Sequence, residues 1–209
     1  MSTENTKNAA RDAVVEGHNI QNTIRNIVTQ ALEDGNMEPG AIKQALNEVV
    51  EGACEGANIK PQKNVETLKE VIDGVDSALT QASMASKLAI EEASGNLQDF
   101  SDHDLKRALN DLQDLESLFF DTLNEVANQG KETAHDTLKN LLNHLQSSGS
   151  SVGQAVGEIL AGLHSDLSEG GRLQKIQAAD VAKATGATVA SIASGILAGI
   201  ADSLQPKDK

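Results

Sequence analysis

One segment of the chain carries an apolar spacing of three and four residues that is sustained over four heptads. Its positions are Val65, Leu68, Ile72, Val75, Leu79, Ala82, Ser86, Ala89 and Ala93. This spacing puts one stripe of side chains on a single face of an α-helix, and the regular seven-residue repeat is typical of a coiled-coil seam. The segment is therefore expected to form a long helix that packs lengthwise on a partner.

Helical periodicity also runs through the rest of the chain. Only three prolines occur, and no stretch alternates apolar and polar residues as a strand does. Turn-forming residues divide the chain into helices at roughly 8–34, 39–57, 63–94, 102–147 and 152–203, with a possible break at 170–171 and a frayed tail at 204–209. We predict an all-α fold of one domain, residues 1–209, forming an elongated antiparallel bundle of about five long helices with coiled-coil-like packing.

The segment 102–147 makes the strongest prediction about shape. Ser101 and Asp104 have the spacing of a helix N-cap and its partner, so a helix is expected to begin there. Its 46 residues would span roughly 69 Å as one helix, at 1.5 Å per residue. A compact globule of this chain length is only about 40–45 Å across. Either the molecule is elongated or this helix bends at Gly130.

Composition limits the kinds of ligand that the chain is built to bind. It has no Trp, no Tyr and three Phe, so the core must consist of Leu, Ile, Val and Ala, and an aromatic-lined ligand pocket is not expected. The net charge is −14, and the few Lys and Arg are scattered. A phosphate backbone would be repelled, and we expect no nucleic-acid partner.

The single cysteine, Cys54, cannot close a disulfide within the chain. It has no neighbouring Cys or basic residue to activate its thiol, so we interpret it as a small core-packing side chain. The chain opens without a basic and apolar secretory leader. Both features predict a cytoplasmic protein.

The run 184–201 holds 18 residues without a charge, which is the lower length limit for a membrane span. Its strongly apolar residues are few and lie mostly on one side of a helix, as in a bundle helix. Small residues form a neighbouring face that suits close helix packing; the candidates are Gly195, Gly199, Ser191 and Thr188. Contact with a lipid or granule surface stays open as the alternative for this run.

No arrangement of residues predicts catalysis or metal binding. The chain contains neither a phosphate-binding glycine loop nor the strand-linked elbow of a serine nucleophile. Glu132 and His135 have the Glu-x-x-His spacing of di-iron bundles, which need a second such pair, and this sequence has none. We expect no catalytic residue, metal or cofactor.

Four strings resemble an uncharacterised bacterial family of alanine-rich helical proteins, classed as a domain of unknown function. They are ASKLAIEEA (85–93), FSDHDLKRALNDL (100–112), LFFDTL (118–123) and SGILAGIAD (194–202). The resemblance covers nearly the whole chain and implies a single all-helical unit, without bringing a catalytic residue or a ligand. A looser similarity, of composition only, is to phasins, the helical proteins that coat storage-polyester granules.

These observations predict a non-enzymatic structural or protein-interaction protein. We expect it to associate with itself, or with a protein partner, through its helix faces. The alternative is a phasin-like or peripheral protein that opens its bundle on a lipid or granule surface. The acidic polar faces argue against an anionic membrane, because helices that lie on such membranes usually carry Lys and Arg.

Overall fold

The computed structural model describes residues 3–34, 39–95, 102–130 and 132–169. These residues form seven α-helices and one short 3-10 turn: α1 (Thr3–Glu16), α2 (Ile20–Asp34), α3 (Pro39–Ile59), η1 (Pro61–Lys63), α4 (Asn64–Gly95), α5 (Asp102–Gln129), α6 (Thr133–Ser148) and α7 (Ser151–Glu169). No strand occurs among them, which confirms the all-α prediction. The number of described helices is seven and not five.

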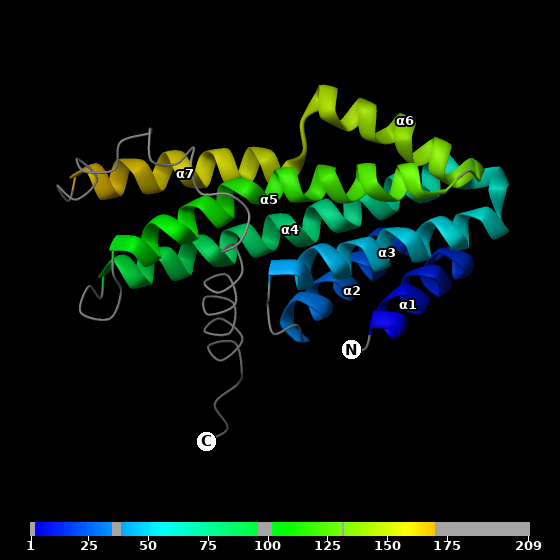
Figure 1. Cartoon of the computed structure of the whole chain (residues 1–209), viewed down its shortest axis with the longest axis horizontal. Helices are drawn as coiled ribbons and strands as arrows, with labels where there is room; N and C mark the ends of the chain where they lie inside the picture. The colour runs from blue at the N-terminus through cyan, green and yellow to red at the C-terminus, as the bar shows by residue number, and fades with distance from the viewer. Residues whose placement is uncertain (1–2, 35–38, 96–101, 131, 170–209) are drawn as a thin grey trace, which may run out of the picture.

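Two long helices, α4 and α5, run along the molecule in opposite directions (Figure 1). Around one end of this pair lie α1, α2, α3 and α6, whereas α7 packs along the other end against both α4 and α5. The described helices therefore make an elongated body with a thick end and a thinner end. The thinner end is built from α4, α5 and α7.

The expected helix 8–34 is interrupted, so that prediction is wrong. Gly17 and Asn19 adopt left-handed backbone conformations, with φ of 73° and 52°, and they separate α1 from α2. Glycine has no Cβ to oppose such a conformation, and asparagine tolerates it better than most residues. The Gly17 amide donates to the Ala13 carbonyl at 3.1 Å, and the Thr23 amide donates to the Asn19 carbonyl at 3.0 Å. The chain therefore ends one helix and starts the next within a few residues.

The expected helix 102–147 is divided at Gly130, where the sequence allowed a bend. The structure shows a full reversal, because α5 ends at Gln129 and α6 folds back along it (Figure 1). At this turn the imidazole ring of His135 lies over Gly130, where a Cβ atom would collide with it, so a larger residue at 130 would displace the ring. The 46-residue helix is thus wrong, although the elongated shape is observed.

The other expected helices agree with the structure within two residues where it describes them. Residues 39–57 correspond to α3, 63–94 to α4, and the beginning of 152–203 to α7. The expected cap at Ser101, the break at 170–171, the remainder of 152–203 and the tail 204–209 lie outside the described residues.

The core is a continuous layer of Leu, Ile, Val and Ala that reaches every described α-helix. Its largest fully buried side chains include Phe119, Ile24, Leu46 and Leu68. The central part of the α4 stripe is buried as expected, from Leu68 to Leu79. Val65, in the first turn of α4, is 59% exposed, so it does not belong to the core.

Most helices that follow each other in sequence are antiparallel, as α3 and α4 show in Figure 1, but α6 and α7 run in the same direction. The closest packing is different, because α1 lies on α3 in a parallel arrangement. Gly52 lies against Lys7 and Gly56 lies against Arg11, so residue numbers rise in the same direction along both helices. The α1–α2 pair therefore packs on the α3–α4 pair, and the bundle combines parallel with antiparallel contacts.

Candidate functional site

Two glycines of α3, four residues apart, bring its backbone against that of α1. A Cβ atom at Gly52 would collide with the carbonyl oxygen of Lys7. A Cβ atom at Gly56 would lie 2.7 Å from the Arg11 carbonyl oxygen and 2.9 Å from the Val14 Cβ. Any larger residue at these positions would have to push the two helices apart.

A third glycine does the same for α2 and α4. A Cβ atom at Gly74 would lie 2.6 Å from the Gln21 carbonyl oxygen and 3.0 Å from the Ile24 Cβ. Close glycine packing was expected in the run 184–201 and not at Gly52, Gly56 or Gly74. A usable signal was present, because Gly52 and Gly56 have the same four-residue spacing as Gly195 and Gly199.

Charged contacts join α3 to its neighbours on both sides. Lys7 Nζ lies 2.9 Å from Glu51 Oε2 and 2.9 Å from Glu55 Oε1, and these hydrogen bonds, first that of Glu55, raise the pKa of Lys7. On the other side of α3, Lys43 Nζ lies 2.7 Å from Glu125 Oε2 of α5. These pairs are partly exposed, so they orient the helices more than they stabilise them.

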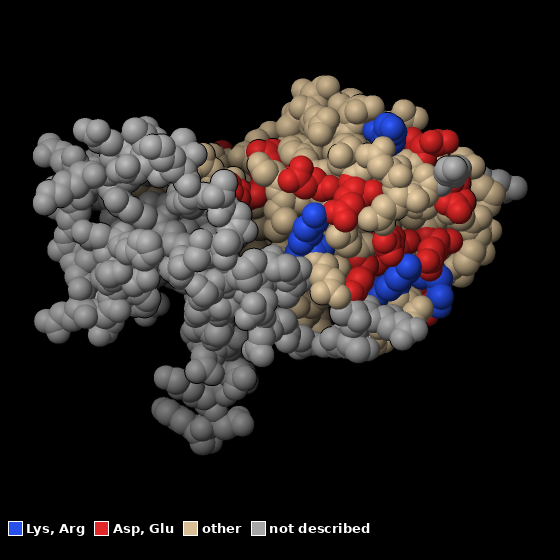
Figure 2. All heavy atoms as spheres, viewed as in Figure 1, with Lys and Arg blue, Asp and Glu red and all other residues tan. Residues whose placement is uncertain are grey.

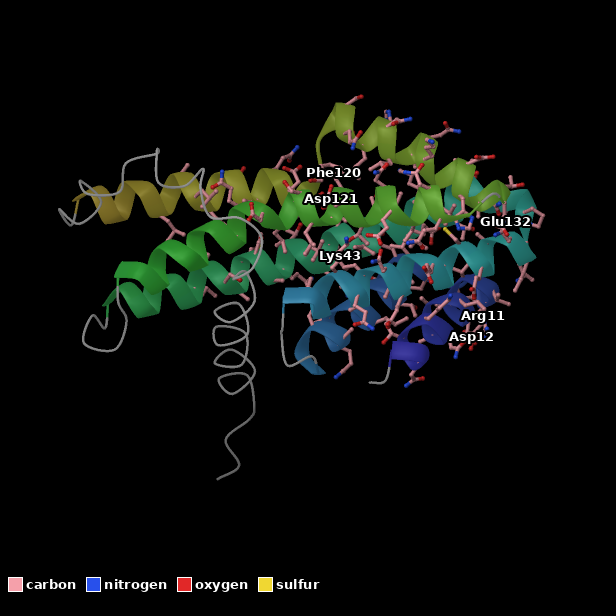
Figure 3. All side chains as sticks on the ribbon, in the orientation of Figure 1. Arg11, Asp12, Lys43, Phe120, Asp121 and Glu132 are labelled. Carbon is pink, nitrogen blue, oxygen red and sulfur yellow. The ribbon has the colours of Figure 1, made fainter. Side chains whose placement is uncertain are left out.

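The face shown in Figure 2 carries many more acidic than basic side chains over α3 and α5. Figure 3 shows Lys43 between α3 and α5, near the labelled Asp121 of α5. Because the few cations over α3 and α5 lie beside carboxylates, the described part of this face has no basic patch for an anionic ligand. It is suited to solvent, or to a partner that tolerates negative charge.

A buried carboxylate of α4 caps the N-terminus of α7. Asp76 is 6% exposed, and its two oxygens accept hydrogen bonds from the amides of Ser151 and Val152, each at 2.8 Å. The first amides of a helix have no partner within that helix, and its N-terminus carries partial positive charge. Asp76 therefore satisfies both requirements from another helix.

A second contact at the same place involves Ser150 and Glu116. The Ser150 Oγ accepts a hydrogen bond from the Gly153 amide at 2.9 Å and donates to Glu116 Oε1 of α5 at 2.6 Å. A side chain at Gly153 would collide with the Glu116 carboxylate. The start of α7 is thus held by side chains of both α4 and α5.

Two further helix ends are bound by side chains from elsewhere. The amide of Ala134, in the first turn of α6, donates to Asn58 Oδ1 of α3 at 3.1 Å. Lys60 donates from Nζ to the carbonyl oxygen of Val15, next to the C-terminal residue of α1. Charge and hydrogen bonding both favour a lysine at a helix C-terminus. The arrangement of the bundle is therefore specified by these long-range contacts as well as by its core.

The Glu-x-x-His pair lies at the start of α6. Glu132 Oε2 is 3.1 Å from His135 Nδ1, close enough for an ion pair when the imidazole is protonated, but Nδ1 makes no hydrogen bond. Within the part of the chain that the structure describes, no group of three or more His, Cys, Asp or Glu side chains could hold a metal ion. The pair has a visible role in the turn, where the ring fills the space above Gly130.

The most unusual surface feature is an apolar face on the second half of α4. Met84 is 53% exposed and Leu88 is 65% exposed, and they lie one turn apart. Gly74, Gln81 and Leu88 follow at seven-residue intervals, so they share one side of α4. That side receives α2 at Gly74, but Gln81 and Leu88 are exposed.

A family model for the family of unknown function DUF6781 matches residues 1–206. The chain belongs to this family. No curated protein and no solved structure matches the DUF6781 chain. The expected resemblance to an uncharacterised family is thereby confirmed, and the function of the family is unknown.

The small-residue face predicted in the run 184–201 lies outside the described residues of the DUF6781 chain; its members are Thr188, Ser191, Gly195 and Gly199. Its packing therefore stays a prediction. None of the described helices is both long and apolar enough to cross a membrane.

The cysteine of the DUF6781 chain is fully buried in α3, as predicted for a core-packing residue. Burial, with the nearby charge of Glu51, raises the pKa of the Cys54 thiol to about 12. The nucleophilic thiolate is thus nearly absent at neutral pH. We expect a thiol reagent at pH 8 to leave the native protein unlabelled and to label it fully in denaturant. Rapid labelling of the native chain would show that Cys54 is accessible.

Proposed function

We propose that this DUF6781 protein is a non-enzymatic helical scaffold that binds a partner helix on the apolar face of α4. The α4 face is the side of the helix that carries Gln81, Met84 and Leu88. The partner helix belongs to a second copy of the chain or to another protein. The exposure of Met84 and Leu88 is the observation that carries the proposal, because a helix-in-groove partner is recognised by apolar side chains at this spacing.

The rest of the described structure supports a scaffold. The close glycine contacts and the caps from Asp76 and Asn58 hold the helices in one arrangement. Such an arrangement presents a helix face without a large ordering cost on binding. The side chains of Asp76 and Ser150 both accept hydrogen bonds from amides at the start of α7, so these polar groups serve the helix end. The single cysteine supports a reducing cytoplasm as the compartment.

The proposal is tested by the association of the purified chain. We expect sedimentation equilibrium to show concentration-dependent self-association of the wild type. Leu88→Asp should weaken it at least about tenfold, because a charge would replace an apolar contact in a desolvated interface. Ser117→Asp, which adds the same charge at an exposed position of α5, is the matched control and should leave association unchanged. Equal association of all three proteins would refute self-association through this face.

The phasin-like alternative makes a different forecast for the same protein. If the run 184–201 seeks a hydrophobic surface, Gly195→Leu should increase co-sedimentation with polyester particles and leave the melting temperature unchanged. If it packs on helices, the added side chain should lower the melting temperature without any adsorption. We expect the second result.

A further inference from the structure

The α4 face is the surface on which the packing of the described helices is incomplete. Among the described helices, α2, α3 and α6 lie along the first half of α4, whereas α5 and α7 lie along its second half in Figure 1. Beyond the end of α2, the side of α4 that carries Gly74 continues with Gln81 and Leu88. One more helix laid along α4 would cover Leu88 and Met84.

The position of α7 indicates where such a helix could come from. The C-terminal ends of α4 and α7 lie at the same end of the molecule, and the two helices are in contact (Figure 1). The chain continues for 40 residues after Glu169. Residues 170–183 are long enough to reach any point on the second half of α4, since an extended chain spans about 3.3 Å per residue.

The chemistry of the run 184–201 fits this face. Val189, Ile192, Ile196 and Ile200 fall on one side of a helix, and the run carries no charge. As a helix its 18 residues would span about 27 Å, and α4 from Gln81 to its end spans about 21 Å. The lengths and the apolar character of the two surfaces therefore match.

Charge and tethering favour the run 184–201 over a second copy of the chain as the segment that covers the α4 face. Each chain carries a net charge of −14, so two whole molecules repel each other as they approach. The run has no charge and is attached to the molecule, which gives it an effective concentration of about millimolar. We propose that the run 184–201 of the same chain packs on the α4 face in the monomer.

The test measures whether position 88 is covered in the full-length monomer. In a Cys54→Ala background, which removes the one native thiol, Leu88→Cys is reacted with a maleimide at a concentration where the chain is monomeric. Glu66→Cys, on the exposed first turn of α4, serves as the uncovered reference. We expect the thiol at position 88 to react about tenfold more slowly than the reference, because it becomes accessible only when the run detaches.

Two variants of the run identify the covering segment. Ile196→Asp puts a charge on the apolar side of the run and should restore fast labelling at position 88. Ser194→Asp puts the same charge on the opposite side of the helix and should keep labelling slow. Fast labelling without any variant, or slow labelling that Ile196→Asp does not change, would overturn the inference. Protection that is lost on dilution would overturn it as well, because a second copy would then be the cover.

A crosslink provides a measurement that does not depend on the Asp variants. The pair Leu88→Cys and Ile196→Cys, joined by a short bismaleimide, should give a crosslinked monomer. The pair Glu66→Cys and Ile196→Cys should not, because Glu66 lies at the other end of α4. Failure of the first pair would refute the intramolecular contact. Self-association by sedimentation is read separately, so the inference and the proposed function can fail independently.

Discussion

Asp76→Ala is expected to lower the free energy of unfolding by about 3 kcal/mol, because it removes the carboxylate that accepts two hydrogen bonds from the first amides of α7. The amides of Ser151 and Val152 would lose their only capping carboxylate, and α7 would lose a favourable charge at its N-terminus. Urea unfolding followed by far-UV circular dichroism measures this change.

Two variants show that the effect belongs to the cap. Asp76→Asn keeps the size of the side chain and one acceptor oxygen, so it should lower the free energy of unfolding by only about half as much as Asp76→Ala. Glu70→Ala removes an exposed carboxylate from the same helix and should change stability by less than about 0.5 kcal/mol. An equal loss for Asp76→Ala and Glu70→Ala would contradict a capping role.

Adding one methyl group at Gly52 is expected to destabilise the protein by about 2 kcal/mol, although alanine is the better helix former. The new Cβ would collide with the backbone of α1 at Lys7, and a backbone carbonyl cannot rotate away as a flexible side chain can. The two helices would have to separate along their whole contact. Thermal or urea unfolding of Gly52→Ala measures the cost.

Gly157→Ala is the matched control, because a Cβ atom at this position of α7 has no other atom within 4 Å. Here the helix preference of alanine acts alone, and stability should rise by about 0.5–1 kcal/mol. The same substitution thus has opposite signs at two helical positions. A gain at both positions would mean that α1 does not rest on the backbone of α3 at Gly52.

Local features of the chain were predictable from the sequence. The boundaries of α4 and the burial of Leu68 to Leu79 followed from a repeat of apolar residues that only a helix can align. The turn between α1 and α2 did not, because Gly17 stands in the apolar stripe with the spacing of an unbroken helix. The left-handed conformations of Gly17 and Asn19 do not change the spacing of apolar residues in the sequence.

The contacts between helices were harder to predict, because they join residues far apart in the chain. Asp76 falls among the apolar positions of α4, which could have marked it as a buried polar group, but its partners lie 75 and 76 residues away. The parallel packing of α1 on α3 likewise depends on two glycines whose partner helix the sequence does not identify. In the first turns of α4, the spacing of Val65 and Leu68 predicted burial at both, but Val65 lies near the end of the helix and is exposed.

The caps of α6 and α7 also bear on how the chain folds as it is synthesised. Asn58 and Asp76 each precede the helix that they cap by about 75 residues, so both acceptors are already made when α6 and α7 leave the ribosome. If α3 and α4 have paired by then, the later helices meet a finished template and can start at the correct residue. The contact of Lys60 with Val15 has the reverse order, so α1 must wait for α3 before its end is fixed. The end of the first helix is therefore fixed only after α3 has been made.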